Sequence, residues 1–102
     1  IGKRTLNFYM VPMLHWPETM VTYLPGENIV FSGDVFGAFG TLDGGIFDDQ
    51  VDLDYLEEEI SRYYSNIVGK YGMPAQTALK KLNTLTFNTI CATHGPIWRS
   101  HV

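Results

Sequence analysis

Three side chains that can bind a metal ion follow apolar segments at separate points of the chain. His15 follows an apolar stretch and lies between two prolines. Asp34 comes just after the apolar segment 29–32, and His94 comes just after the segment 87–92. In α/β folds, functional side chains gather at strand ends, where loops converge over a rigid sheet. Two imidazoles and one carboxylate suit iron or zinc, so these three residues are candidate metal ligands.

Each of these residues also has a simpler interpretation. A single histidine is more often a structural residue than a ligand, and an aspartate after a glycine is more often a turn former. Periodicity does not separate the two interpretations. For four other features the simpler interpretation is favoured. Cys91 is expected to be a small buried strand residue, and the acidic run 57–59 to be a solvated helix face. Asp48 and Asp49 are expected to form a polar loop end, and His101 to belong to a frayed terminus.

Four strands are expected to position these side chains. Runs rich in apolar and β-branched residues predict strands at 4–11, 20–24, 29–32 and 87–92. The segment PGEN at 25–28 predicts a tight turn, because proline presets φ and glycine tolerates a positive φ. The second and third strands therefore form a hairpin.

Two helices are expected between the third and the last strand. Asp52 is the predicted N-cap of the first helix, which has one broad apolar face and ends at Gly69 or Gly72. The second helix starts near Pro74, a residue suited to a first helical turn. The glycine-rich segment 33–50 also contains three phenylalanines, which predicts a long, packed functional loop.

The composition is that of one small globular domain. The chain has 102 residues and a formal net charge of −4, and its 7 lysines and arginines are scattered. A basic stripe that would favour nucleic-acid binding is therefore absent. The single cysteine excludes an internal disulfide and indicates a reducing compartment. No apolar run approaches the roughly 20 residues that span a membrane. We expect neither nucleic acid nor a membrane as a partner.

Three motifs resemble those of one enzyme family. The segment LPGENIVFSGDVFG at 24–37 resembles the metallo-β-lactamase superfamily, in which F-S/T-G-D ends a strand with a metal-bridging aspartate. The segments LHWPETMVTYLP at 14–25 and THGPIWR at 93–99 resemble the diiron domain of flavodiiron proteins, or A-type flavoproteins. Between His15 and Asp34 lie 18 residues, and between Asp34 and His94 lie 59, close to the family's intervals. The resemblance covers the chain from about Lys3 to Arg99.

This resemblance implies a fold, an activity and a role for each motif residue. The fold would be α/β, the C-terminal half of a metallo-β-lactamase-like αββα sandwich. The activity would be reduction of O2, nitric oxide or both at a non-haem diiron site. His15 would be a terminal ligand of one iron, Asp34 the bridging carboxylate and His94 a terminal ligand of the second iron. Trp16 would help to wall the substrate pocket, and no catalytic residue beyond the metal ligands is implied.

The family pattern also has parts that this sequence lacks. An H-x-E-x-D-x-H motif would precede Ile1, and a flavodoxin-like domain that carries FMN would follow the last motif. Residues 1–102 are therefore expected to be a partial diiron domain cut from a longer protein, inactive in isolation. In the family, FMN reaches the diiron site of a neighbouring subunit in a cytoplasmic enzyme, so a cytoplasmic homo-oligomer is expected.

Two other functions stay open at this point. A zinc-dependent hydrolase of the same superfamily is compatible with FSGD, although HWPET differs from the GHTPG-like segment typical of those hydrolases. The other alternative is a non-catalytic, metal-free fragment. A half-sandwich would expose one apolar sheet face, so this fragment would self-associate.

Overall fold

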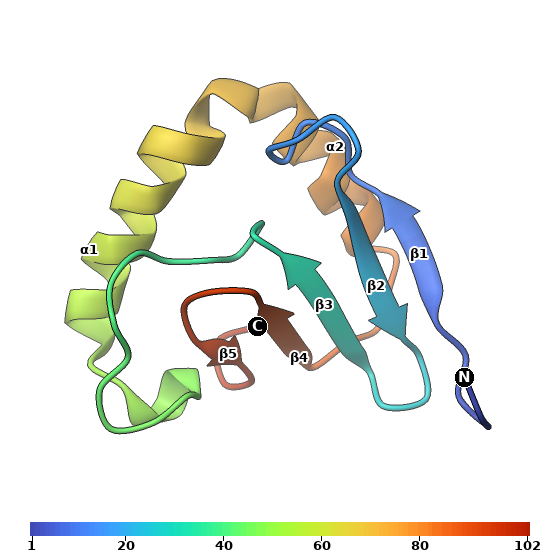
Figure 1. Ribbon diagram of the computed structural model, residues 1–102, viewed down its shortest axis with the longest axis horizontal. Helices are drawn as coiled ribbons and strands as arrows, with labels where there is room; N and C mark the ends of the chain where they lie inside the picture. Colours follow the sequence, from blue (N-terminus) through green and yellow to red (C-terminus); the bar gives the residue numbers. More distant parts are fainter.

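A five-stranded sheet forms the centre of the computed structural model, which describes residues 1–102 (Figure 1). Its strands lie side by side in chain order. They are β1 (Asn7–Met10), β2 (Met20–Leu24), β3 (Ile29–Gly33), β4 (Thr89–Ala92) and β5 (Ile97–Trp98). The pairs β1–β2, β2–β3 and β4–β5 are antiparallel, whereas β3 and β4 are parallel. The mixed α/β fold expected from the sequence is confirmed.

The parallel pair determines where the ends of β3 and β4 lie. Parallel neighbours need a long crossover connection. Here the crossover contains the 3₁₀ turn η1 (Asp48–Gln50), α1 (Leu53–Tyr63), the π-helical segment η2 (Tyr64–Val68), the 3₁₀ turn η3 (Gly69–Tyr71) and α2 (Gly72–Leu82). Because the two strands run the same way, the residues that follow them emerge at the same edge of the sheet. Gly33 lies opposite Ala92 at that edge.

The first helix starts where the sequence predicts. The Asp52 side chain accepts hydrogen bonds from the backbone N–H groups of Asp54, at 3.1 Å, and Tyr55, at 3.3 Å. These bonds satisfy N–H groups that have no partner inside the helix. A negative charge at this end is also favourable to the helix dipole.

One face of the sheet carries the hydrophobic core. Side chains alternate between faces along each strand, so Val21, Tyr23 and Val30 point the same way, toward the helices. Tyr23 also donates a hydrogen bond to the carbonyl of Thr86, at 2.6 Å. The core cluster comprises Val11, Leu14, Val21, Tyr23, Val30, Tyr63, Val68, Ala75, Ala78 and Leu82. The helical layer therefore covers this face.

The opposite face of the sheet is apolar and uncovered, as expected for a half-sandwich. Phe8 is 60% exposed and Phe31 is 45% exposed. Both pair with Thr22, so they lie in one row across three strands. Met10 and Met20 pair with each other, and each is about half exposed. An uncovered row of this kind favours association with another surface.

The structure differs from the expected elements in several places. The first strand spans Asn7–Met10 rather than 4–11, and the strand expected at 87–92 begins at Thr89. Helix α1 ends at Tyr63 before passing into π-helical and 3₁₀ turns. Strand β5 was not predicted, because two residues after a Gly-Pro turn give no periodic signal. None of the helices has the length and the apolar composition that a membrane span requires.

Candidate metal centre

The three predicted ligands come together at one edge of the sheet. The Nε2 atom of His15 lies 3.4 Å from Oδ2 of Asp34, and the Nε2 atom of His94 lies 3.7 Å from Oδ1 of Asp34. Asp34 follows β3 and His94 follows β4, so the parallel pairing of these strands places them together. His15 reaches the same point from the loop between β1 and β2.

The loop that carries His15 is closed on itself and anchored in the core. Leu14 is only 2% exposed and belongs to the core cluster. The backbone N–H of Val11 donates to the carbonyl of Thr19 at 2.9 Å, and the Trp16 N–H donates to the Thr19 hydroxyl at 3.1 Å. These contacts fix the backbone on both sides of His15.

His94 is oriented by a carbonyl on the opposite loop. Its Nδ1 lies 2.9 Å from the carbonyl oxygen of Ala38. A carbonyl only accepts hydrogen bonds, so we assign the proton to Nδ1, which leaves the Nε2 lone pair free on the side of Asp34. Metal-binding histidines are commonly held in this way.

Two glycines allow the close approach between His94 and this loop. A Cβ on Gly37 would lie 2.2 Å from Cε1 of His94. A Cβ on Gly95 would lie 2.8 Å from the backbone nitrogen of Ala38, and Gly95 has a φ of +83°. Glycine is therefore required at both positions for the imidazole to sit where it does.

Asp34 and His94 each have a further neighbour. The Thr93 hydroxyl donates a hydrogen bond to Oδ1 of Asp34. The ring of Tyr63 meets the His94 ring edge-on, with the ring centroids 4.8 Å apart. Burial, together with the negative charge of Asp34, raises the pKa of Tyr63 to about 12. The Tyr63 hydroxyl is buried without a hydrogen-bond partner.

The three candidate ligands do not form a closed metal site by themselves. No group of three or more His, Cys, Asp and Glu side chains is arranged to hold a metal ion. Each imidazole instead faces a different oxygen of Asp34. The side chains of His15, Asp34 and His94 are 25%, 39% and 38% exposed, which leaves room for further ligands. Imidazole and carboxylate donors fit iron, so these residues fit part of a two-metal centre.

Trp16 lies beside this centre and is mostly in solvent. Its ring centroid is 5.5 Å from that of His15, and the residue is 61% exposed. The sequence-based expectation that it walls a substrate pocket stays a prediction.

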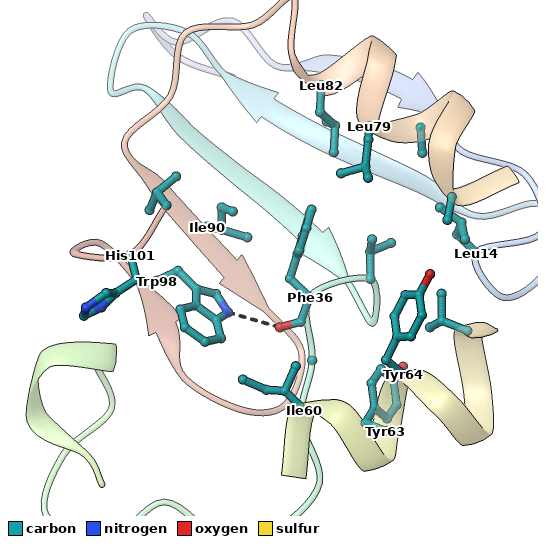
Figure 2. Close-up of a pocket in the computed structure, with 16 residues that line it drawn as sticks. Leu14, Phe36, Ile60, Tyr63, Tyr64, Leu79, Leu82, Ile90, Trp98 and His101 are labelled. Carbon is teal, nitrogen blue, oxygen red and sulfur yellow. Dashed lines mark hydrogen bonds between the residues drawn. The ribbon is translucent and has the colours of Figure 1, made fainter. Parts of the chain in front are cut away.

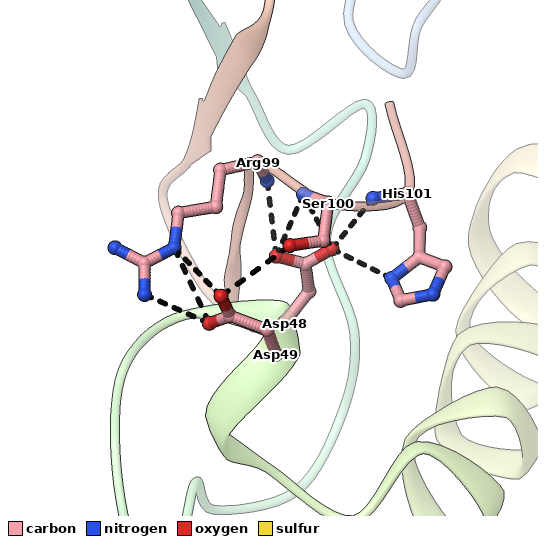
Figure 3. Close-up of polar contacts among 5 residues, drawn as sticks. All are labelled: Asp48, Asp49, Arg99, Ser100 and His101. Carbon is pink, nitrogen blue, oxygen red and sulfur yellow. Dashed lines mark hydrogen bonds and ion pairs between the residues drawn. The ribbon is translucent and has the colours of Figure 1, made fainter.

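A second polar cluster, which sequence reasoning missed, ties down the end of the chain (Figure 3). Asp48 is fully buried and accepts hydrogen bonds from the backbone N–H groups of Arg99, Ser100 and His101. Its Oδ2 also lies 2.9 Å from Nδ1 of His101. Burial alone would raise the pKa of Asp48, but these hydrogen bonds, from Arg99 and His101 above all, lower it to about 2.

The interpretation of His101 as part of a frayed terminus is therefore wrong, because Asp48 holds both its backbone and its ring. Arg99 strengthens the same cluster. Its guanidinium binds the Asp49 carboxylate at 2.9 Å and lies 3.6 Å from the centroid of the Phe47 ring. The hydrogen bonds of Arg99 lower the pKa of Asp49 against the effect of desolvation. The only signal in the sequence was the pair of adjacent aspartates before α1.

Comparisons with known proteins agree with this geometry. The family model "ODP family beta lactamase" matches residues 1–95. The chain is 39% identical over 101 residues to a nitric oxide reductase of Moorella thermoacetica, which covers 97% of this chain and 25% of the relative. A flavodiiron protein from Giardia intestinalis superimposes with a TM-score of 0.93 at 36% identity, covering 99% of this chain and 24% of that one. Rubredoxin oxygen:oxidoreductase from Desulfovibrio gigas superimposes with a TM-score of 0.89 at 36% identity, covering 95% of this chain and 24% of that one.

The chain thus spans about a quarter of the length of these relatives. The match extends over nearly every residue of this chain, and it includes the strands and loops that carry His15, Asp34 and His94. The chain therefore belongs to the ODP beta-lactamase family and corresponds to a portion of the β-lactamase-like domain of flavodiiron proteins.

Proposed function

We propose that residues 1–102 form part of the diiron domain of a flavodiiron oxidoreductase that reduces O2, nitric oxide or both. The observation that carries this proposal is the placement of Asp34 between two imidazoles, one beside each carboxylate oxygen. Such a carboxylate can bridge two metal ions, each with one histidine as a further ligand. The similarity to a nitric oxide reductase and to an oxygen oxidoreductase supports the same reaction class.

The residues of this chain have defined parts in that chemistry. The two irons, when bound, would bind the gas and transfer electrons to it. Ala38 holds the His94 ring so that Nε2 stays directed at the centre, and Thr93 holds one oxygen of Asp34. The ring of Tyr63 packs edge-on against the His94 ring and covers one side of it.

Three protein ligands are too few to hold two irons tightly. On this proposal the chain is a partial diiron domain, and the remaining ligands and the FMN site come from segments outside residues 1–102. The isolated chain is then inactive as a reductase. The complete protein is proposed to act in the cytoplasm, where FMN of one subunit serves the diiron site of another.

The uncovered sheet face supports self-association of residues 1–102. Phe8 and Phe31 lie in one row on that face, with Met10 and Met20 beside them. Four large apolar side chains that are about half exposed favour burial against a second apolar surface. We expect a homo-oligomer in which two such faces meet.

Metal analysis of the full-length protein tests the proposal. Iron in the wild type should be lost in His15→Ala and His94→Ala, and kept in His101→Ala. His101 is a matched control because it is also a histidine paired with an aspartate, but it lies at the Asp48 cluster. Consumption of O2 or nitric oxide with an added electron donor should follow the iron content. Zinc with hydrolase activity would support the superfamily alternative, and a protein without metal would contradict both.

A further inference from the structure

An apolar cavity lies between the helices and the core face of the sheet (Figure 2). Its volume is about 340 Å³, and 14 of its 16 lining residues are hydrophobic. Leu82 of α2 and Ile90 of β4 line opposite sides, with Ile60 of α1 at another edge. Leu79 of α2 lines the cavity and is 46% exposed, so this side of it reaches solvent. Small molecules therefore have a route into it.

The cavity shares a wall with the candidate metal centre. Leu14 precedes His15 in the chain and lines the cavity. Val35 follows Asp34 and also lines it.

Gly37 and Tyr63, which both lie against the His94 ring, complete the same wall. Every candidate ligand is thus one residue, or one side-chain contact, away from the cavity. A molecule in the cavity would lie directly behind the centre.

The lining favours a small neutral molecule over water or an ion. A bound water needs two to four polar partners. The indole N–H of Trp98 already donates to the carbonyl of Phe36, at 3.1 Å, and the Tyr63 hydroxyl is the buried side-chain oxygen in this wall that has no partner. A charged ligand would lose most of its hydration, because His101, the imidazole in the lining, already binds Asp48 through Nδ1. Apolar cavities of about 150 Å³ remain dry and bind xenon or benzene, so this volume is ample for a diatomic gas.

We propose that this cavity binds small, neutral, weakly polar molecules of the size of O2 and nitric oxide, and holds them behind the metal centre. Tyr63 and Gly37 form the barrier between the cavity and His94. The part of the inference that concerns delivery to the metals rests on the proposed function, whereas binding in the cavity does not.

Xenon is a suitable probe because it is neutral, polarisable and chemically inert. Full-length crystals pressurised with xenon should show it inside the cavity, between α2 and β4. Ala78 lines the cavity from α2 and is 3% exposed, so Ala78→Leu should place a larger side chain in this space and remove the xenon. Leu79→Ala enlarges the same space and should increase xenon occupancy. Circular dichroism of both variants would verify that the fold is kept.

Several results would overturn the inference. These are a folded wild type without xenon in the cavity, a cavity filled by ordered water or by a flanking protein segment, and xenon that persists unchanged in Ala78→Leu. The proposed function is tested separately by iron content and gas consumption. Normal iron and turnover without xenon binding would refute only the cavity inference, whereas xenon binding in a protein that takes up no metal would refute only the proposed function.

Discussion

Replacing Gly37 by alanine is expected to displace the His94 imidazole. A methyl group on Gly37 would lie 2.2 Å from Cε1, 2.6 Å from Nδ1 and 2.8 Å from Nε2 of His94. All of these separations are shorter than any normal contact. Gly37 does not have a positive φ, so alanine introduces no backbone strain and the clash is the whole perturbation. Tyr63 lies against the ring, which limits how far His94 can move.

The magnitude follows from what the displaced ring loses. Breaking the 2.9 Å contact between His94 Nδ1 and the Ala38 carbonyl costs about 1 kcal/mol. Inserting a methyl group into a packed region costs a further 1–3 kcal/mol, roughly. The free energy of unfolding should therefore fall by about 2–4 kcal/mol. Loss of the contact that orients a metal-binding histidine should lower metal affinity by roughly 10–100-fold.

Urea unfolding of the apoprotein and iron titration of the full-length protein would measure the two effects. Gly26→Ala is the matched control, because a Cβ on Gly26 has no neighbour within 4 Å. It should leave both stability and iron binding near the wild-type values. If Gly37→Ala bound iron as tightly as this control, the assignment of His94 as an oriented ligand would be refuted.

Three further predictions concern other parts of the chain. Asp48→Asn should lower the free energy of unfolding by about 1.5–3 kcal/mol at neutral pH in urea titrations. Because the pKa of Asp48 falls from 3.8 to about 2 on folding, its contribution is complete above about pH 4 and is lost as the pH falls toward 2. Tyr63→Phe removes an unpaired buried hydroxyl, so stability should stay equal or rise by about 1 kcal/mol. Phe8→Glu combined with Phe31→Glu should turn an oligomer of residues 1–102 into a monomer in light scattering, and a monomeric parent would contradict self-association.

The placement of the candidate ligands at strand ends could be predicted because these residues sit next to strong local signals, whereas their role as metal ligands was implied by the resemblance and stays a prediction. His94 follows a short apolar strand and precedes a Gly-Pro turn, and Asp34 follows a strand that ends at Gly33. The hairpin of β2 and β3 was marked by a proline and a glycine in its turn. Strand and turn chemistry acts over a few residues, so it is visible in a single sequence.

The Asp48 cluster could not be predicted in the same way. Its partners lie 51–53 residues away along the chain, and most of them are backbone N–H groups rather than side chains. Any sequence supplies backbone N–H groups, so no residue type marks the donors that Asp48 binds. The apolar cavity was hidden for a similar reason. Its lining comes from α1, η2, α2, β4, β5, two loops and the segment after β5, and only the tertiary fold shows where their packing leaves space.

The candidate metal centre and the Asp48 cluster join the same two segments, the loop after β3 and residues 94–101. These two connections explain how a long glycine-rich loop can support a metal ligand. Near its start, the loop after β3 receives His94 through the Ala38 carbonyl. Near its end, it holds the chain after β5 through Asp48. The segment 94–101 is therefore fixed to this loop at both ends. Loosening the far end should disturb His94 less than a clash beside it, so Asp48→Asn should weaken iron binding less than Gly37→Ala, even where the two variants lose similar stability. An equal loss of iron in both variants would mean that the loop moves as one rigid unit.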